Sequence, residues 1–237
     1  MARETIVLLH GFTQTGRSWG PTIAALGERY RALAPDIRGH GGAADLRPVS
    51  FDAVHADLFA LTPGPFALAG YSMGGRIALA LALAAPDRVS RLTLVGASPG
   101  LADAEERRAR RTADDALADR IEEEGIEAFA ESWSSLPLFA DQPPAVAAAT
   151  HAMRLQQSPA GLAAALRGLG TGAMDPLWER LPQLTIPVAL IVGERDAKFR
   201  AIAKRMAGAL PDAALHVVPG AGHAVQLERP DAVAALL

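Results

Sequence analysis

The residue with the clearest chemical potential is Ser72, which stands in the sequence Gly70-Tyr-Ser-Met-Gly74. An apolar run over 66–69 leads into it, and a helical pattern over 76–85 leads out of it. So sharp a turn from strand to helix needs neighbours without Cβ atoms, because the chain passes close by. Ser72 is therefore predicted to project its hydroxyl at the amino end of a helix, where free N–H groups favour negative charge on a reacting oxygen.

A serine becomes reactive when a base takes its proton, and an imidazole held by a buried carboxylate suits this task. Asp196 lies in the loop after one predicted strand, and His223 lies in the loop after the next. The order along the chain is serine, aspartate, histidine. Ser72, Asp196 and His223 are therefore predicted to form a catalytic triad.

Two other residues compete for the roles of acid and base. His216 falls inside a predicted strand rather than beyond its end, which is typical of a structural histidine. Glu194 lies nearer its strand than Asp196 does, and Asp196 is better placed to turn back toward the serine. We favour Asp196 and His223, with Glu194 as the alternative acid.

The chemistry also needs donors for an oxyanion, and the first predicted strand, 4–9, opens directly into His10-Gly11-Phe12. Gly11 permits an unusual backbone angle, so that the N–H of Phe12 can point at a reacting oxygen. The N–H of Met73 is the expected second donor.

The remaining histidines indicate no metal site. His40 lies in the glycine-rich loop 38–42, which lacks the lysine and hydroxyl of a phosphate-binding loop, and it is expected to be a hydrogen-bonded loop residue. His55 falls in the predicted helix 51–61 and is expected at the surface. Because the six histidines fall at no ligand-like spacing, neither a metal nor an organic cofactor is expected.

Strands and helices alternate along the chain, which predicts a parallel sheet with helices on both faces. About six main strands are expected, mostly or wholly parallel, because residues 1–4 leave no room for an antiparallel pair at the start. The predicted strands include 4–9, 31–36, 66–69, 91–96, 187–193 and 214–218, and helices are predicted at 22–30 and 51–61.

The pattern changes between the fourth and fifth strands. Residues 100–181 hold four or so helical stretches and no convincing strand, with breaks at prolines and glycines. An insertion at the carboxyl edge of the sheet would lie over Ser72 as a lid. The sequence therefore predicts a core formed by 1–99 and 182–237, with a helical cap at 100–181 inside a single domain.

Composition fits one compact domain, since the chain has 237 residues, of which 50% are hydrophobic and 21% charged. The absence of cysteine removes disulfides and thiol chemistry. The start of the chain lacks a leader pattern, so a cytoplasmic protein is expected, and the net charge of −3 argues against nucleic-acid or membrane partners. The predicted last helix begins at Asp231 and is cut at Leu237, which indicates either a trimmed chain or a short terminus.

The chain resembles the α/β-hydrolase superfamily over nearly its whole length. The resemblance rests on the strand-to-helix turn Gly70–Gly74, called the elbow below, on the His10-Gly11 loop, and on the order of the acid and the histidine. The triad alone does not choose between ester hydrolysis, C–C cleavage and elimination. Arg76 follows the elbow glycines and is expected to face the pocket, where a plain esterase has no evident need for a charge. The run 107–111 carries four arginines that spread around a helix, so at least two are expected to face solvent and pair with Glu105 or Glu106.

The arginine run, together with Gly193-Glu-Arg-Asp-Ala-Lys-Phe-Arg200, resembles the 2-succinyl-6-hydroxy-2,4-cyclohexadiene-1-carboxylate synthases, a family of lyases of the menaquinone pathway. The resemblance implies a small polycarboxylate substrate, a triad of Ser72, Asp196 and His223, and loss of pyruvate without an acyl-enzyme. It further implies carboxylate binding by three arginines and a pocket lined by two aromatic residues: Arg76, Arg110, Arg154, Tyr71 and Trp133. Arg107, Arg108 and Arg111 remain alternatives to Arg110.

Overall fold

A computed structural model describes residues 3–237, in which six strands form one parallel sheet with the order β2-β1-β3-β4-β5-β6. This confirms the expected number and direction of the strands. Met1 and Ala2, which belong to the short segment before the first strand, lie outside the described residues. The strands are β1 (Thr5–Leu9), β2 (Arg31–Leu33), β3 (Phe66–Tyr71), β4 (Val89–Val95), β5 (Val188–Gly193) and β6 (Ala213–Val218).

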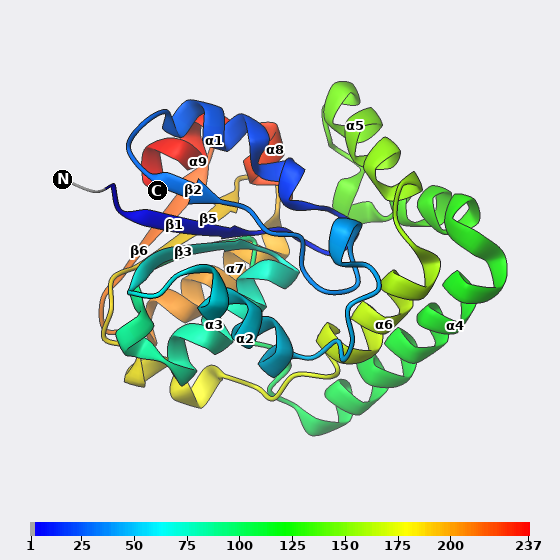
Figure 1. The fold of residues 1–237 in the computed structure, drawn as a ribbon, viewed down its shortest axis with the longest axis horizontal. Coiled ribbons are helices and arrows are strands. Elements are labelled where there is room, and N and C mark those ends of the chain that lie inside the picture. Colours follow the sequence, from blue (N-terminus) through cyan, green and yellow to red (C-terminus); the bar gives the residue numbers. More distant parts are fainter. Residues whose placement is uncertain (1–2) are drawn as a thin grey trace.

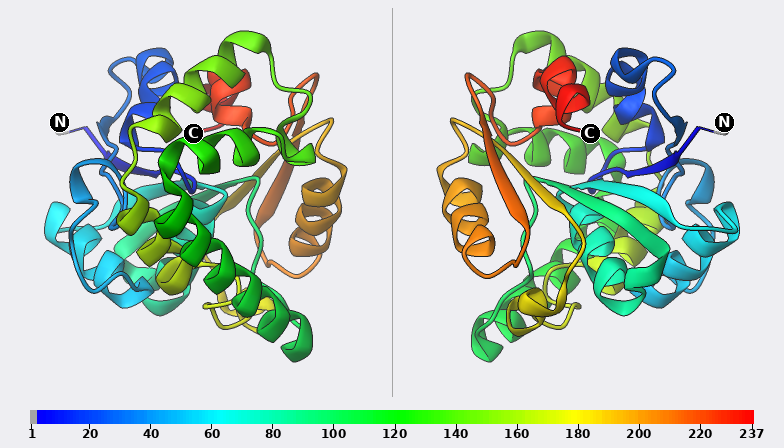
Figure 2. Two further views of the ribbon diagram at one scale, coloured as in Figure 1. Left: turned by 90° about the vertical axis from the view of Figure 1, so that its right-hand side faces the viewer. Right: turned by 90° about the vertical axis from the view of Figure 1, so that its left-hand side faces the viewer.

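Helices cover both faces of the twisted sheet (Figures 1 and 2). In β1, Ile6 and Leu8 pack into the cluster on one face, whereas Val7 and Leu9 pack into the cluster on the other. A strand that is buried on both faces has a continuous run of apolar residues in its sequence, and residues 6–9 are such a run. The first face carries α1 (Gly20–Leu26), α8 (Val225–Glu228) and α9 (Pro230–Leu236), and the second carries α2 (Phe51–Leu61), α3 (Met73–Ala84) and α7 (Ala197–Ala207).

Two elements end several residues earlier than predicted. The helix predicted to run from 22 to 30 ends at Leu26, because Gly27 adopts a φ of 58°. The strand predicted over 31–36 ends at Leu33, two residues before Pro35, which has no N–H to donate. Short 3₁₀ helices complete the fold at η1 (Gly16–Trp19), η2 (Gly41–Ala43), η3 (Pro86–Arg88), η4 (Pro137–Phe139) and η5 (Trp178–Gln183).

The segment between β4 and β5 is helical and consists of α4 (Ala104–Ser134), α5 (Pro144–Leu155) and α6 (Pro159–Leu169). It lies beyond the carboxyl ends of the strands (Figure 1). Gly125 interrupts α4 with φ 84° and ψ 178°, so the segment contains four helical stretches, as expected, although the sequence did not predict this break. Apolar residues of α4 and α6 pack together in their own cluster, which includes Ile121 and Leu166.

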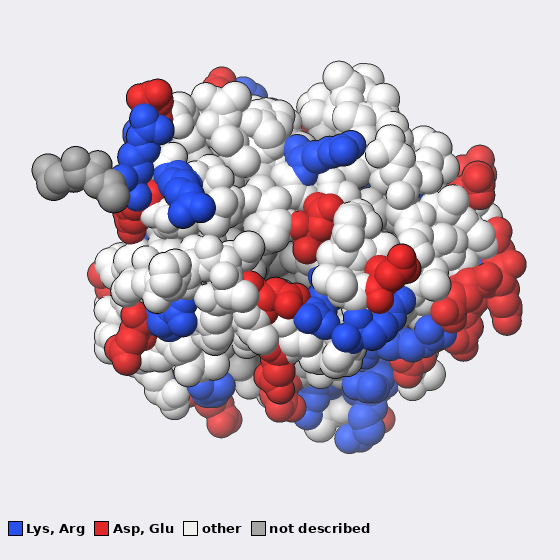
Figure 3. Space-filling model, viewed as in Figure 1, with Lys and Arg blue, Asp and Glu red and all other residues white. Residues whose placement is uncertain are grey.

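On the face shown in Figure 3, charged side chains of both signs are interspersed, and basic ones gather near the start of α4. Within residues 3–237, no helix combines the length and the apolar character needed to cross a membrane.

Candidate active site

Ser72 lies at the sharp turn from β3 to α3, with φ 51° and ψ −108°. The glycines on either side are required by close packing rather than by their own angles. A Cβ at Gly70 would overlap the carbonyl oxygen of Gly74, and a Cβ at Gly74 would overlap the carbonyl oxygen of Leu9. The local sequence therefore places the Ser72 hydroxyl at the amino end of α3, as predicted.

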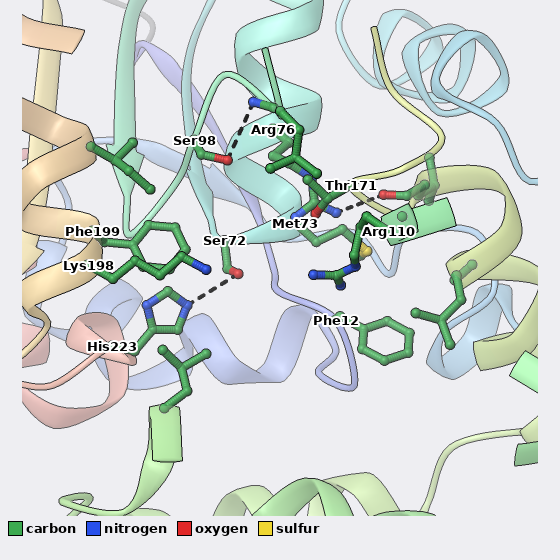
Figure 4. Close-up of a pocket in the computed structure, with 18 of the residues that line it drawn as sticks. Phe12, Ser72, Met73, Arg76, Ser98, Arg110, Thr171, Lys198, Phe199 and His223 are labelled. Atoms are coloured by element: carbon green, nitrogen blue, oxygen red, sulfur yellow. Dashed lines mark hydrogen bonds between the residues drawn. The ribbon is translucent and has the colours of Figure 1, made fainter. Parts of the chain in front are cut away.

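The three predicted triad residues lie together, and Figure 4 shows Ser72 next to His223. The Nδ1 atom of His223 is 2.6 Å from Oδ2 of Asp196, and its Nε2 atom is 3.3 Å from Oγ of Ser72. Both Asp196 and His223 are buried, and the other carboxylate oxygen of Asp196 accepts the N–H of Phe199 at 3.2 Å. Because a carboxylate only accepts, Nδ1 carries the proton and Nε2 is free to accept one from Ser72.

The alternative acid and base lie elsewhere. Glu194 accepts the backbone N–H of Gly220 at 2.9 Å. His216 lies in β6, where it pairs with Ile191 of β5. Neither contacts Ser72, so the geometry favours Asp196 and His223.

His10 anchors the loop that carries Phe12. Its Nε2 atom accepts the N–H of Ile37 at 2.9 Å, and its Nδ1 atom lies 2.8 Å from the carbonyl oxygen of Gly11. Burial lowers the pKa of His10 to about 4, so the ring is neutral near pH 7. The imidazole therefore braces the loop and is not available as the base.

Gly11 does not adopt the unusual backbone angle that the sequence suggested, and in this loop Thr13 has the positive φ, 67°. Gly11 is needed for space instead, since a Cβ there would lie 2.6 Å from the Tyr71 ring. The Phe12 N–H donates to no acceptor found in residues 3–237, and the Met73 N–H belongs to the first turn of α3, which lacks intrahelical acceptors. Their role as oxyanion donors stays a prediction.

Two further histidines are buried. His40 is a loop residue whose Nδ1 atom lies 3.4 Å from the carbonyl oxygen of Arg38, as expected, and burial next to His10 lowers its pKa to about 3. His55 was expected at the surface, and this was wrong. The residue is 9% exposed, and its Nε2 atom lies 3.3 Å from the carbonyl oxygen of Ile77 on α3.

A cavity of about 470 Å³ opens above Ser72. Apolar side chains from the helical segment form much of its wall, and Trp133 packs edge-on against Phe12 with ring centroids 5.3 Å apart. Among the predicted site residues, those that line it are Ser72, His223, Phe12, Met73, Arg76, Arg110 and Trp133.

Arg76 reaches the cavity from the first turn of α3. Its Nη2 atom donates to the carbonyl oxygen of Leu169 at 2.8 Å, and its buried Nε atom has no partner in residues 3–237. Burial, reinforced by the nearby charge of Arg110, lowers its pKa to about 10. Arg76 is therefore charged at neutral pH, and one of its buried N–H donors has no acceptor in the described part of the chain.

Of the four arginines in the run, Arg110 lines the cavity. Its Nε atom donates to Oδ1 of buried Asp114 at 2.7 Å, and Oδ2 of Asp114 accepts the N–H of Gly172 at 3.4 Å. The expected pairing of the run with Glu105 or Glu106 is wrong. The salt bridges found in residues 3–237 include no such pair. Arg110 instead forms a salt bridge with Asp114, which lies one turn later on the same helix.

Two predicted substrate binders lie behind the cavity wall rather than on it. Tyr71 packs against His223, with ring centroids 5.3 Å apart, and burial raises the pKa of Tyr71. Arg154 is 3% exposed and donates from Nη1 to Oγ of Ser134 at 2.8 Å, and burial lowers its pKa. Their contact with substrate stays a prediction.

Sequence reasoning did not single out Ser98, Lys198 and Phe199, which also line the cavity. The Phe199 ring covers the imidazole of His223, with centroids 4.4 Å apart. Lys198 and Phe199 belong to the motif quoted above for 193–200, so their presence beside Asp196 was the available signal. In the described part of the chain, no group of three or more acidic or histidine side chains converges as metal ligands would.

Known proteins are similar to this chain over nearly its whole length. Residues 6–236 match the Alpha/beta hydrolase family. The 2-succinyl-6-hydroxy-2,4-cyclohexadiene-1-carboxylate synthase of Klebsiella pneumoniae is 36% identical, over 98% of this chain and 91% of that protein. A Bacillus subtilis (strain 168) protein, whose name gives the same activity provisionally, is 38% identical over 97% of this chain and 87% of that protein.

A solved structure is also similar to the chain. The structure of MenH from S. aureus matches with a TM-score of 0.94 and 33% sequence identity, and covers 100% of this chain and 92% of that one. With relatives above 30% identity over nearly full length, the chain belongs to the 2-succinyl-6-hydroxy-2,4-cyclohexadiene-1-carboxylate synthases of the α/β hydrolase family.

Proposed function

We propose that this protein is a carbon–oxygen lyase of menaquinone biosynthesis. Its substrate is 2-succinyl-5-enolpyruvyl-6-hydroxy-3-cyclohexene-1-carboxylate, and its products are pyruvate and 2-succinyl-6-hydroxy-2,4-cyclohexadiene-1-carboxylate. The observation that carries the proposal is the cavity in which Arg76 and Arg110 face the same space as Ser72 and His223. Such a wall suits a substrate with several carboxylates, because a guanidinium pairs with a carboxylate through charge-assisted hydrogen bonds.

The proposed reaction begins with removal of a proton from the ring carbon next to the succinyl ketone. Ser72 acts as the base with help from His223, which accepts the hydroxyl proton at Nε2 while Asp196 holds Nδ1. The electron pair of the broken C–H bond forms a new ring double bond, the existing double bond shifts, and the ring C–O bond breaks. Pyruvate leaves as its enolate and takes a proton at carbon.

Charge develops on oxygen during this step. The N–H groups of Phe12 and Met73 are the proposed donors to that oxygen, and loss of such a donor typically costs roughly 10²–10³ in rate. The immediate base is either the Ser72 alkoxide or His223 itself. In both versions Nε2 of His223 gains a proton, and neither version needs an acyl-enzyme.

The test supplies the enolpyruvyl cyclohexene and follows pyruvate through NADH oxidation by lactate dehydrogenase. The proposal predicts saturable pyruvate release well above the enzyme-free rate and slow turnover of p-nitrophenyl esters. The alternative, a serine hydrolase acting on an acidic substrate, predicts the reverse, with a burst of nitrophenol. Tight calorimetric binding of the substrate without turnover would instead indicate a binding protein.

A further inference from the structure

Lys198 is a third cationic group in the cavity, and the proposed reaction does not yet use it. It is the second residue of α7 and lies two positions after Asp196. The salt bridges found in residues 3–237 do not include it. Its amine lies over the ring of Phe199, 5.7 Å from the ring centroid, which is near the outer limit for a cation–π interaction.

The position is unfavourable for a lysine within the helix itself. The first turn of a helix carries a partial positive charge, so a cation there is destabilising, whereas cations are favourable in the last turn. Lys204 and Arg205 lie in the last turn of α7 and follow this rule, whereas Lys198 and Arg200 lie among its first four residues. A residue that breaks a local preference is expected where function requires it.

Lys198 and the arginines approach the cavity from different sides. Figure 4 shows the Lys198 amine pointing into the cavity from the side of His223 and Phe199, with Ser72 between it and Arg110. The Phe199 ring, tilted by 41° against the imidazole of His223, forms an apolar surface beside the amine. An ammonium group with three donors therefore faces the space above the reacting atoms.

We propose that Lys198 forms a second carboxylate-binding subsite on the His223 side of the cavity. It binds one carboxylate of the substrate while Arg76 and Arg110 bind another, so that the reacting ring is held across Ser72. This inference rests on the proposed polycarboxylate substrate, because a monoanion would occupy only one of the two sides.

The kinetic test uses the only two lysines of the chain. Lys198→Met keeps an apolar stem and removes the charge. Lys204→Met makes the same change on the same helix; both lysines are exposed, but Lys204 lies outside the cavity. Loss of a charge-assisted carboxylate contact should lower kcat/KM roughly ten- to a hundredfold in the first variant, mainly through KM. Lys198→Arg should recover part of this loss, and Lys204→Met should match the unmodified enzyme.

A second measurement does not depend on turnover. Reductive methylation with formaldehyde and borohydride labels both lysines, and mass spectrometry reports each peptide separately. Succinate, used as a dicarboxylate probe, should slow labelling of Lys198 and leave Lys204 unchanged, whereas succinamide should protect neither.

The outcomes separate this proposal from the proposed function. If pyruvate forms, Lys198→Met behaves like the unmodified enzyme and succinate gives no protection, the subsite is wrong and the lyase assignment stands. If succinate protects Lys198 but no pyruvate forms, the subsite stands and the lyase assignment is wrong.

Discussion

Ser72 has a backbone conformation that costs a residue with a side chain of the order of 1–3 kcal/mol. The neighbouring glycines make that conformation possible by allowing α3 to pass against β1 and β3. The result is a hydroxyl held 3.3 Å from the Nε2 atom of His223, at the amino end of a helix. The strain is stored where the proposed chemistry needs a fixed oxygen.

The arginine run gives a prediction with an internal control. Arg110→Ala should raise KM for the enolpyruvyl substrate roughly ten- to a hundredfold, because it removes a charged donor from the cavity wall. Arg111→Ala removes the exposed neighbour on the same helix, which does not line the cavity, and should leave KM within about twofold. If steady-state kinetics gave the same rise in KM for Arg110→Ala and Arg111→Ala, the arginine run would act on substrate binding through its overall charge and not through Arg110.

Among the individual site residues, the sequence predicted the triad but not the inward-facing arginine. Asp196 and His223 each follow a strand, and parallel strands end at one edge of a sheet, so their meeting with Ser72 could be predicted. The sequence could not predict which arginine of the run 107–111 turns toward the cavity, because four arginines in five positions spread around a helix. That choice depends on Asp114, whose burial against the loop at Gly172 follows only from the packing of the helical segment.

Among the elements, α4 shapes the cavity through one break and one buried carboxylate. Gly125 lets the chain turn within α4, so that its second part can bring Trp133 over Phe12. In the first part, Asp114 links the helix to the loop that follows α6 and holds Arg110. Prolines and glycines at helix ends predicted the other breaks, whereas a lone glycine within a helical pattern does not signal one by itself.

The break in α4 can be tested through stability. Gly125→Ala should lower the free energy of unfolding by about 1–3 kcal/mol, because φ 84° with ψ 178° is accessible essentially to glycine alone. Gly208→Ala is the matched control, since Gly208 has helical angles and its added Cβ would make only ordinary contacts. Urea unfolding measures both variants, and equal stabilities would contradict the strained break.

Asp114 should affect both stability and binding. Asp114→Asn removes the charge that offsets Arg110 and Arg76, so we expect a loss of about 1–3 kcal/mol in the free energy of unfolding and a higher KM. Asp115→Asn, one residue along α4, is the control, because no ion pair of Asp115 is found in residues 3–237. If Asp114→Asn bound substrate as well as the unmodified protein, Asp114 would not position Arg110.

The whole molecule gathers distant parts of the chain at one edge of its sheet. Loops after β1, β3, β5 and β6 and the helical segment between β4 and β5 all contribute to the cavity or the triad. The number and direction of the strands, the helix layers and the place of the insertion follow from alternating patterns that the sequence shows directly. The cavity volume and the burial of His55 depend on how the layers pack, which no local pattern reports.

The buried histidines make stability depend on pH. Burial lowers the pKa of His10 to about 4 and that of His40 to about 3, whereas unfolded histidines take up protons below about pH 6.5. The unfolded state therefore gains protons first, and the free energy of unfolding should fall by roughly 2 kcal/mol per histidine between pH 7 and pH 5.

Urea unfolding at the two pH values checks this. His40→Gln should show a smaller fall than the unmodified protein, because one of the two buried imidazoles is gone. His216→Gln, a change on the edge strand β6, should leave the fall unchanged. A stability that is the same at pH 7 and pH 5 would mean that His10 and His40 are protonated in the folded protein.

The most direct test of the account is pyruvate release from the enolpyruvyl cyclohexene by the unmodified protein and by Ser72→Ala. The control is Ser90→Ala, which removes an exposed hydroxyl near the amino end of β4. Loss of a general base typically costs roughly 10²–10⁴ in rate, so Ser72→Ala should fall by that factor while Ser90→Ala keeps the full rate. Full pyruvate release by Ser72→Ala would contradict the proposal that this serine takes the proton.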